Sequence, residues 1–249
     1  MAINNQMQVM KQMKQELTRF MMLYKFALQE LETKIEILQE EFQLLHDYNP
    51  IEHTASRLKS PQSIAEKLFR KQHELSLTSI KQNIKDIAGL RITCSFVSDI
   101  YRISDMLTGQ SDLRTLEVKD YIKEPKPNGY QSLHLLVEVP VFMSDRTEHV
   151  CVEVQIRTIA MDFWASLEHK IFYKYKKEVP LHLLRELKEA ADSASALDRK
   201  MERLQKEIEA IKEEQEDEGG DELVGLLLRQ QNLSLPPALL GLFEDDRQK

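Results

Sequence analysis

The 249-residue sequence contains no apolar run long enough to span a membrane and no segment typical of a signal peptide. Its net charge of −7 argues against a protein whose main task is to coat nucleic acid, because such binding needs many cations to neutralise phosphates. Only two cysteines are present, Cys94 and Cys151, and neither has a cysteine or histidine at ligand spacing. We therefore expect a cytoplasmic protein whose cysteines are buried free thiols rather than a disulfide or a metal site.

The first third of the chain has the pattern of two helices. Residues 5–47 repeat apolar side chains at helical spacing, and a turn at Asn49–Pro50 should end this long helix. A second helix should begin at Ser60, with the serine as N-cap and Pro61 in the first turn. Its predicted buried side chains are Ile64, Leu68 and Leu75.

The middle of the chain contains four strand candidates, at residues 90–97, 113–118, 132–139 and 150–156. Three of them alternate apolar and polar side chains, whereas 113–118 is weaker. A short helix at 100–107 should connect the first two. This order predicts an α+β fold with a mixed β-sheet flanked by helices.

Two further helices are expected after the sheet, at residues 159–177 and about 184–211. The second has near-heptad apolar spacing, which suits a partner helix or a coiled coil. In the first, Phe163, Trp164, Leu167 and Ile171 are expected in the core. We expect one domain over residues 1–212, an acidic linker at 213–222 and an apolar tail of unknown role at 223–249.

Two acidic residues are candidate metal ligands. Asp86 directly precedes a predicted strand, and Glu153 lies on the polar side of another strand, two residues before Gln155. Magnesium typically takes one or two carboxylates and completes its shell with phosphate oxygens and water. Taken singly, Asp86 is more simply a helix-terminal aspartate and Glu153 a surface glutamate. Together with the other motifs of the chain, they predict a magnesium site.

A basic segment around Ser60 is a candidate phosphate site. Ser63 and Lys67 are four residues apart and share one helix face, and Arg57 and Lys59 come just before the helix. The N-terminus of a helix directs backbone N–H groups at anions. By itself, this segment is more simply a solvated basic surface.

The loop before the third strand presents a tyrosine. Pro125 and Pro127 restrict the chain before Tyr130, and Gly129 allows a conformation that other residues cannot reach, so the tyrosine ring is a good stacking surface for a base. His134 follows four residues later. An alternative is that Tyr130 merely covers the sheet edge. Three polar residues of the next helix are either helix surface or pocket wall, and they are Asp162, Glu168 and His169.

Five motifs occur in one order along the chain, and together they resemble a known family. They are Arg57-x-Lys59, Asp86 to Arg91, Lys126 to His134, Glu153 to Thr158, and Phe163 to His169. This set resembles the synthetase domain of the RelA/SpoT family over about residues 15–210. The chain length and the lack of regulatory domains are similar to the small alarmone synthetases, in particular their RelP-like branch.

The resemblance implies a nucleotidyltransferase-like fold that transfers pyrophosphate from ATP to the ribose 3′-hydroxyl of GDP or GTP, making (p)ppGpp for the stringent response. It implies Mg²⁺ as cofactor and a homotetramer built through long N- and C-terminal helices. The implied roles are Arg57 and Arg91 on adenine; Lys59, Ser63 and Lys67 on the ATP phosphates; Asp86 and Glu153 on magnesium and in catalysis; Tyr130 on guanine; and Lys126, Asn128, His134 and Gln155 on the acceptor.

His46–Asp47 spells the dipeptide of the hydrolase metal site in this family, but that site needs further ligands from a much longer preceding region. We interpret it as the end of the first helix and expect no hydrolase activity. One alternative is a catalytically silent nucleotide- or RNA-binding regulator on the same fold, which intact Asp86 and Glu153 disfavour. Another is a helical scaffold, which would need no polar set on its sheet.

Overall fold

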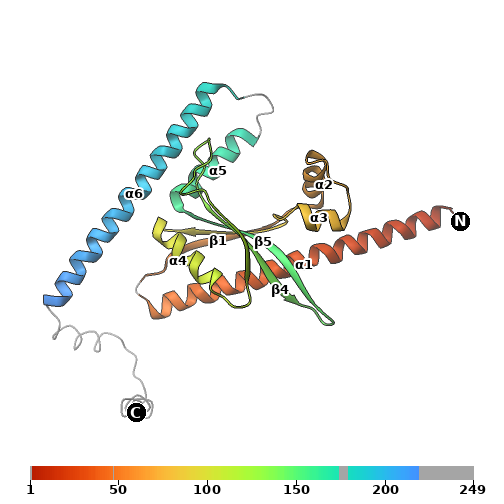
Figure 1. The fold of residues 1–249 in the computed structure, drawn as a ribbon, viewed down its shortest axis with the longest axis horizontal. Helices are drawn as coiled ribbons and strands as arrows, with labels where there is room; N and C mark the ends of the chain where they lie inside the picture. The colour runs from red at the N-terminus through yellow and green to blue at the C-terminus, as the bar shows by residue number, and fades with distance from the viewer. Residues whose placement is uncertain (1, 47, 174–178, 219–249) are drawn as a thin grey trace, which may run out of the picture. The chain divides into compact units, whose positions relative to one another are not determined.

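The computed structural model describes residues 2–46, 48–173 and 179–218. The elements within these ranges are α1 (Ala2–Leu45), β1 (Ile51–Leu58), α2 (Pro61–Arg70), α3 (Leu77–Asn83), β2 (Ala88–Cys94), α4 (Val97–Thr108), β3 (Arg114–Asp120), β4 (Leu133–Phe142), β5 (Thr147–Thr158), α5 (Ile159–Tyr173) and α6 (Leu181–Glu218) (Figure 1). The α+β class predicted from the sequence is confirmed. No helix in these ranges is both long and apolar enough to cross a membrane.

The chain divides into two units, Met1–Glu202 and Arg203–Lys249, and the sheet lies in the first. Helix α6 continues to Glu218, so the described part of the expected acidic linker, residues 213–218, is helical. The remainder of that linker and the apolar tail lie outside the described residues, as does Asp47 of the His46–Asp47 pair.

The five strands form one mixed sheet in the order β1-β2-β5-β4-β3. Strands β2 and β5 are parallel, and the other neighbours are antiparallel. Strand β1 is absent from the prediction. It is an edge strand in which only Ile51 is buried, so no alternation of apolar and polar residues marks it in the sequence.

One side of the sheet is apolar and carries the core. Helix α1 packs against β1, β2, β4 and β5, and α4 packs against β2 and β5 (Figure 1). Fully buried side chains meet there. They include Leu31 and Ile35 of α1, Leu90 and Ile92 of β2, Leu135 of β4, and Val154 and Ile156 of β5. Burying each such side chain stabilises the fold by about 1.5–3 kcal/mol, which fixes the sheet on the long helix.

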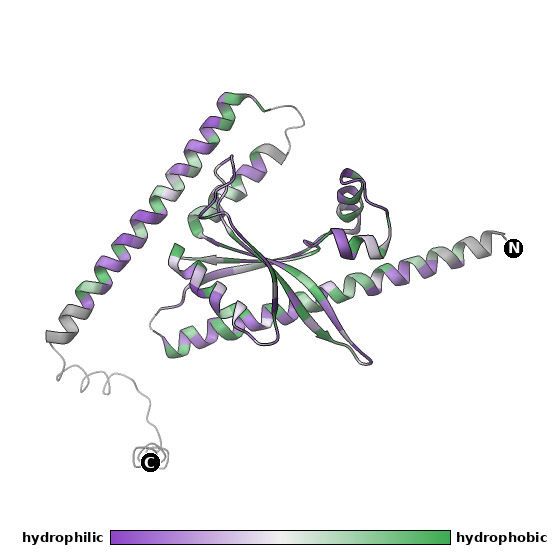
Figure 2. Ribbon diagram, viewed as in Figure 1, coloured by the Kyte–Doolittle hydropathy of each residue, from purple (hydrophilic) through white to green (hydrophobic). Residues whose placement is uncertain are grey.

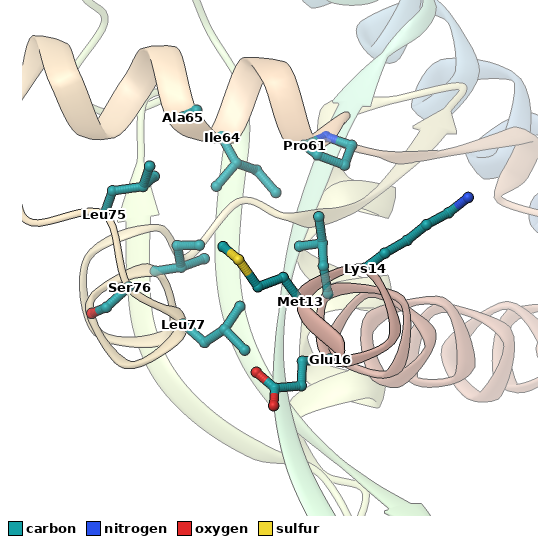
Figure 3. Close-up of a pocket in the computed structure, with 11 residues that line it drawn as sticks. Met13, Lys14, Glu16, Pro61, Ile64, Ala65, Leu75, Ser76 and Leu77 are labelled. Carbon is teal, nitrogen blue, oxygen red and sulfur yellow. The ribbon is translucent and has the colours of Figure 1, made fainter. Parts of the chain in front are cut away.

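Helix α2 begins as predicted, with Ser60 as N-cap and Pro61 in its first turn. It buries Ile64 and Leu68, but the expectation for Leu75 is wrong. Leu75 lies beyond the end of the helix and is 61% exposed. It lines an apolar pocket of about 530 Å³ where α1, α2 and α3 meet (Figure 3).

The predicted core of α5 is largely wrong. Trp164 is buried, and its indole N–H donates to the Leu187 carbonyl of α6 at 3.1 Å. Phe163 and Ile171 are 65% and 60% exposed, and Leu167 is also exposed. Helical spacing identified an apolar helix, but α5 packs on the sheet through one narrow face only.

Helix α6 carries an exposed apolar stripe, and Figure 2 shows hydrophobic and hydrophilic residues alternating along it. The exposed members are Leu197, Met201, Leu204, Ile208 and Ile211. Both cysteines are free, as expected. Cys94 is buried, whereas Cys151 is only half-buried, because it projects from β5 on the side opposite Val150 and Val152.

Candidate active site

The register of the sheet brings predicted site residues onto one face. Arg57 of β1 pairs with Gly89 of β2, and Gly89 pairs with Glu153 of β5. Residues directly opposite one another on neighbouring strands project from the same side of a sheet. Since Gly89 has no side chain, the side chain of Arg57 can lie across it. A Cβ there would lie 3.6 Å from Arg57 Cγ.

A second row of polar residues lies two positions along the same strands. Arg91 of β2 pairs with Gln155 of β5, which pairs with His134 of β4. Because side chains alternate between faces with a period of two, this row projects on the same side as Arg57 and Glu153. The polar face of the sheet therefore carries residues expected at both the donor and the acceptor nucleotide.

Asp86, just before β2, is held by two lysines. Lys59 Nζ lies 2.6 Å and Lys67 Nζ 2.7 Å from its Oδ2 atom. Burial favours a raised pKa of Asp86, but the hydrogen bonds and charges of the two lysines outweigh it and lower the pKa to about 2. The carboxylate is therefore ionised. Ser63 lies in the first turn of α2, where its backbone N–H and hydroxyl both contact Ser60 Oγ.

Asp86 and Glu153 line one pocket of about 220 Å³ together with Lys67 and His134. The sequence did not point to several of the other residues that line it. These are Asn83, Lys85, Glu117 and Lys119, whereas Lys71 belongs to the basic segment that contains Lys67. Lys119 pairs with His134 across β3 and β4, and strand parity could have found it. Its ammonium contacts Glu117 at 2.9 Å, which raises the pKa of Lys119.

Glu153 is also ionised. Burial favours a higher pKa of Glu153, as does the charge of Asp86, but contacts with His134 and Gln155 lower it overall. Gln155 Nε2 donates to Glu153 Oε2 at 2.9 Å, and His134 Nδ1 lies 3.6 Å from Oε1. Two negative groups thus share a pocket that lysines surround.

This pair fits a divalent cation. Asp86 Oδ1 is buried and has no hydrogen-bond partner among the described residues, so an acceptor lone pair is available there. The described ranges contain no group of three or more potential metal ligands of the His, Cys, Asp and Glu types. Magnesium needs only one or two protein carboxylates when substrate phosphates complete its shell.

The loop before β4 is a rigid turn. Gly129 has a φ of +88°, and its N–H donates to the Lys126 carbonyl at 2.8 Å. Asn128 Oδ1 accepts from the Tyr130 N–H at 3.2 Å. The loop lies directly on α6, since a Cβ at Gly129 would approach Ala191 Cβ to 2.5 Å.

Tyr130 is half-buried rather than fully presented. Its hydroxyl and His134 Nε2 share a hydrogen bond of 2.8 Å, and Lys126 Nζ lies 4.6 Å from the ring centroid. Burial raises the pKa of Tyr130, although nearby Arg157 opposes this, so the phenol is neutral. Tyr121, which the sequence did not indicate, contacts the same group, with Lys126 Nζ 4.5 Å from its ring centroid.

Three residues of α5, expected either on the helix surface or in the pocket wall, differ in their position. They are Asp162, Glu168 and His169. Asp162 is part of the site, because its Oδ1 atom lies 3.0 Å from Arg91 Nη1 and 3.4 Å from Arg157 Nη1. Glu168 lies beside the loop that precedes β4, where it accepts from Asn128 Nδ2 at 3.4 Å. His169 is exposed on the helix and does not line the pocket.

The chain is similar to known proteins in sequence and in fold. Residues 56–178 match the family described as "Region found in RelA / SpoT proteins". The chain is also 55% identical over 201 residues to GTP pyrophosphokinase YwaC of Bacillus subtilis (strain 168), covering 81% of this chain and 94% of that protein. The chain belongs to the RelA/SpoT family.

Solved structures of RelA/SpoT relatives share the fold. The crystal structure of small alarmone synthetase 2 from Bacillus subtilis matches with a TM-score of 0.71 and 53% identity, over 77% of this chain and 99% of that one. Small alarmone synthetase 1 from the same organism, bound to its product pppGpp, matches with a TM-score of 0.72 and 39% identity, over 78% and 98%. The RelA/SpoT resemblance predicted from the motifs is confirmed.

Proposed function

We propose that this RelA/SpoT-family protein is a GTP pyrophosphokinase, which transfers pyrophosphate from ATP to the 3′-hydroxyl of GDP or GTP to make (p)ppGpp. The observation that carries the proposal is the pair of ionised carboxylates, Asp86 and Glu153, facing one lysine-rich pocket on the polar face of the sheet. The names of its relatives, GTP pyrophosphokinase and small alarmone synthetase, support the same activity.

The donor, ATP, lies on the side of β1, β2 and α2. Arg57 and Arg91 project from the sheet toward the same side and hold the adenine between their guanidinium planes. Lys59, Ser63 and Lys67 bind the phosphates. In doing so the two lysines exchange Asp86 Oδ2 for phosphate oxygens, so that Oδ2 becomes available to a cation together with the unpartnered Oδ1.

Asp86 and Glu153 hold magnesium, which supplies charge neutralisation for the phosphates when it is bound. Glu153 accepts the proton of the ribose 3′-hydroxyl. Transfer of a phosphoryl group depends mainly on alignment and on stabilising charge, so the site needs no nucleophilic serine or cysteine.

The acceptor lies on the side of β4. Guanine stacks on Tyr130, and it must displace the Lys126 ammonium that covers this ring. Lys126, freed from the ring, is then available to the acceptor phosphates. Asn128, His134 and Gln155 orient the nucleotide from the loop and the two central strands.

The protein acts in the cytoplasm, where its nucleotide substrates are held, and serves the stringent response as a synthetase without hydrolase activity. Assembly into a homotetramer is supported by apolar side chains left exposed on the terminal helices. They include Met7, Met10 and Met13 of α1, and Leu197 and Met201 of α6. Such side chains are commonly covered by a partner helix.

Two isosteric variants test this assignment. We expect Asp86→Asn and Glu153→Gln each to abolish alarmone synthesis from ATP and GDP with magnesium, since each removes one negative charge from the site. The matched control is Glu148→Gln. Glu148 lies on β5, like Glu153, but contacts Arg146 and does not line the pocket. Folding is monitored by circular dichroism. Full activity in either site variant would contradict the assignment.

A further inference from the structure

One member of the Glu153 to Thr158 motif has no role in the mechanism above. Arg157 lies on β5 with the same parity as Glu153 and Gln155, so it projects from the polar face of the sheet. Its side chain is only 5% exposed. Burying a guanidinium is costly unless it is paired and hydrogen-bonded, so a cation at this position requires a specific reason.

Arg157 is the centre of a continuous polar network. Its Nη1 atom lies 3.4 Å from Asp162 Oδ1, and its Nη2 atom donates to Gln155 Oε1. Asp162 Oδ1 also accepts a hydrogen bond from Arg91 Nη1 at 3.0 Å. Arg157 Nε is buried without a hydrogen-bond partner among the described residues, so the guanidinium is positioned by its two terminal nitrogens.

The network continues from Gln155 to the acceptor site. Gln155 Nε2 donates to Glu153, Glu153 contacts His134, and His134 shares a hydrogen bond with Tyr130. The contacts therefore run in order through Asp162, Arg157, Gln155, Glu153, His134 and Tyr130. Because Asp162 also contacts Arg91, the path connects Arg91, which is expected on adenine, with Tyr130, which is expected on guanine.

We propose that Arg157 is a positioning residue that fixes the orientation of the Gln155 amide and, through it, the Glu153 carboxylate. Arginine has only hydrogen-bond donors, so the Gln155 atom that faces Arg157 must be the carbonyl oxygen. The amide NH₂ is then forced toward Glu153, where a carboxylate can accept from it. Without the guanidinium, the amide of Gln155 can rotate, and Glu153 loses a defined donor.

Asp162 completes the arrangement. It places a negative charge beside Arg157 and Arg91 at once, which keeps two like-charged guanidinium groups close together on one side of the site. Arg91 keeps its own contact with Asp162 when Arg157 is changed. Loss of Arg157 should therefore disturb the acceptor side much more than the donor side.

The inference rests on the proposed function and is tested with Arg157→Met, which keeps an unbranched apolar side chain but removes every donor. We expect kcat/KM for GDP to fall about 10–100-fold, as is usual for residues that orient a functional group, with KM for ATP within about threefold of the wild type. The control is Arg114→Met, which changes an exposed arginine on β3 that pairs with Glu138. It should leave both constants unchanged.

Two further measurements separate positioning from a general structural role. GDP affinity, measured by calorimetry without ATP, should weaken in Arg157→Met, and this readout stands even if the wild type shows no turnover. Turnover by the wild type and by Arg114→Met tests the proposed function separately. If Arg157→Met does not fold, as judged by its melting transition, Arg157→Lys is used, which keeps the charge but not the fork.

A double variant gives the sharpest test. If Arg157 acts through Gln155, then Gln155→Met combined with Arg157→Met should be no worse than Gln155→Met alone, because the intermediary is already absent. Losses that multiply in the double variant would overturn the inference. It would also be overturned if Arg157→Met kept wild-type GDP affinity and kcat/KM, or if KM for ATP rose as much as KM for GDP.

Discussion

Gly129→Ala should specifically damage binding of the acceptor nucleotide. Gly129 has a φ of +88°, a region that costs a residue with a side chain about 1–2 kcal/mol. The new Cβ would also lie 2.5 Å from Ala191 Cβ of α6, and such overpacking typically costs about 1–3 kcal/mol. The position of the loop should therefore be disfavoured by about 2–5 kcal/mol in total.

This cost falls on the loop that carries Lys126, Asn128 and Tyr130. If it is borne by the loop alone, the lower limit of about 2 kcal/mol corresponds to about a 30-fold loss of GDP affinity. The assay compares KM for GDP with KM for ATP, and only the first should rise, because the donor residues lie on β1, β2 and α2.

The contact with α6 provides an internal control. Ala191→Gly added to Gly129→Ala removes the clash but not the strained φ, so it should recover part of the GDP affinity. Ala190→Gly changes the neighbouring, exposed alanine at the same cost in helix propensity, about 1 kcal/mol, and should recover nothing. The reasoning would be refuted if Gly129→Ala kept the wild-type KM for GDP, or if both glycine changes rescued it equally.

Two predictions concern pH and stability. The pKa of Asp86 is about 2 in the folded protein against an ordinary 3.8, so its ion pairs contribute about 2 kcal/mol that is present above about pH 4 and lost as pH falls toward about 2. Urea unfolding should show the gap between wild type and Asp86→Asn closing over that range, and a constant gap would be inconsistent with the ion pairs. Asp198 accepts from Thr158 Oγ1 at 2.6 Å, and burial and the charge of Glu202 raise the pKa of Asp198. The protonated carboxyl therefore contributes to the stability of the fold, and this contribution is lost as pH rises and Asp198 ionises. Asp198→Asn keeps an acceptor for Thr158 and should therefore raise the melting temperature at neutral pH, whereas a lowered one would argue against this.

The sequence predicts the elements whose signal is local. The Ser60–Pro61 start of α2 and the alternation in β2, β4 and β5 are each dictated by a cap or by one buried face. Strand β1 has no such signal, because an edge strand exposed on both faces does not alternate. The exposed Phe163 of α5 shows the same limit, since periodicity marks an apolar helix without saying how much of it is covered.

The motifs predict which residues belong to the candidate site, but they do not predict the contacts between those residues. Asp86 and Glu153 are 67 positions apart in the sequence, and only the parallel pairing of β2 with β5 brings their surroundings together. The sequence does not single out Arg157, although it continues the series Glu153 and Gln155, because a charged residue at a strand end is normally solvated. Its burial depends on Asp162 of the following helix, which strand parity does not reveal.

The most direct test of the account follows the phosphorus atoms of ATP. Purified protein is incubated with magnesium, GDP and ATP labelled either at the α- or at the γ-phosphate, and the products are separated by chromatography. Transfer of pyrophosphate predicts that the γ-label moves to a more highly phosphorylated guanine nucleotide while the α-label stays in AMP, in equal amounts. A γ-label found only in inorganic phosphate, or an unlabelled guanine nucleotide, would contradict it.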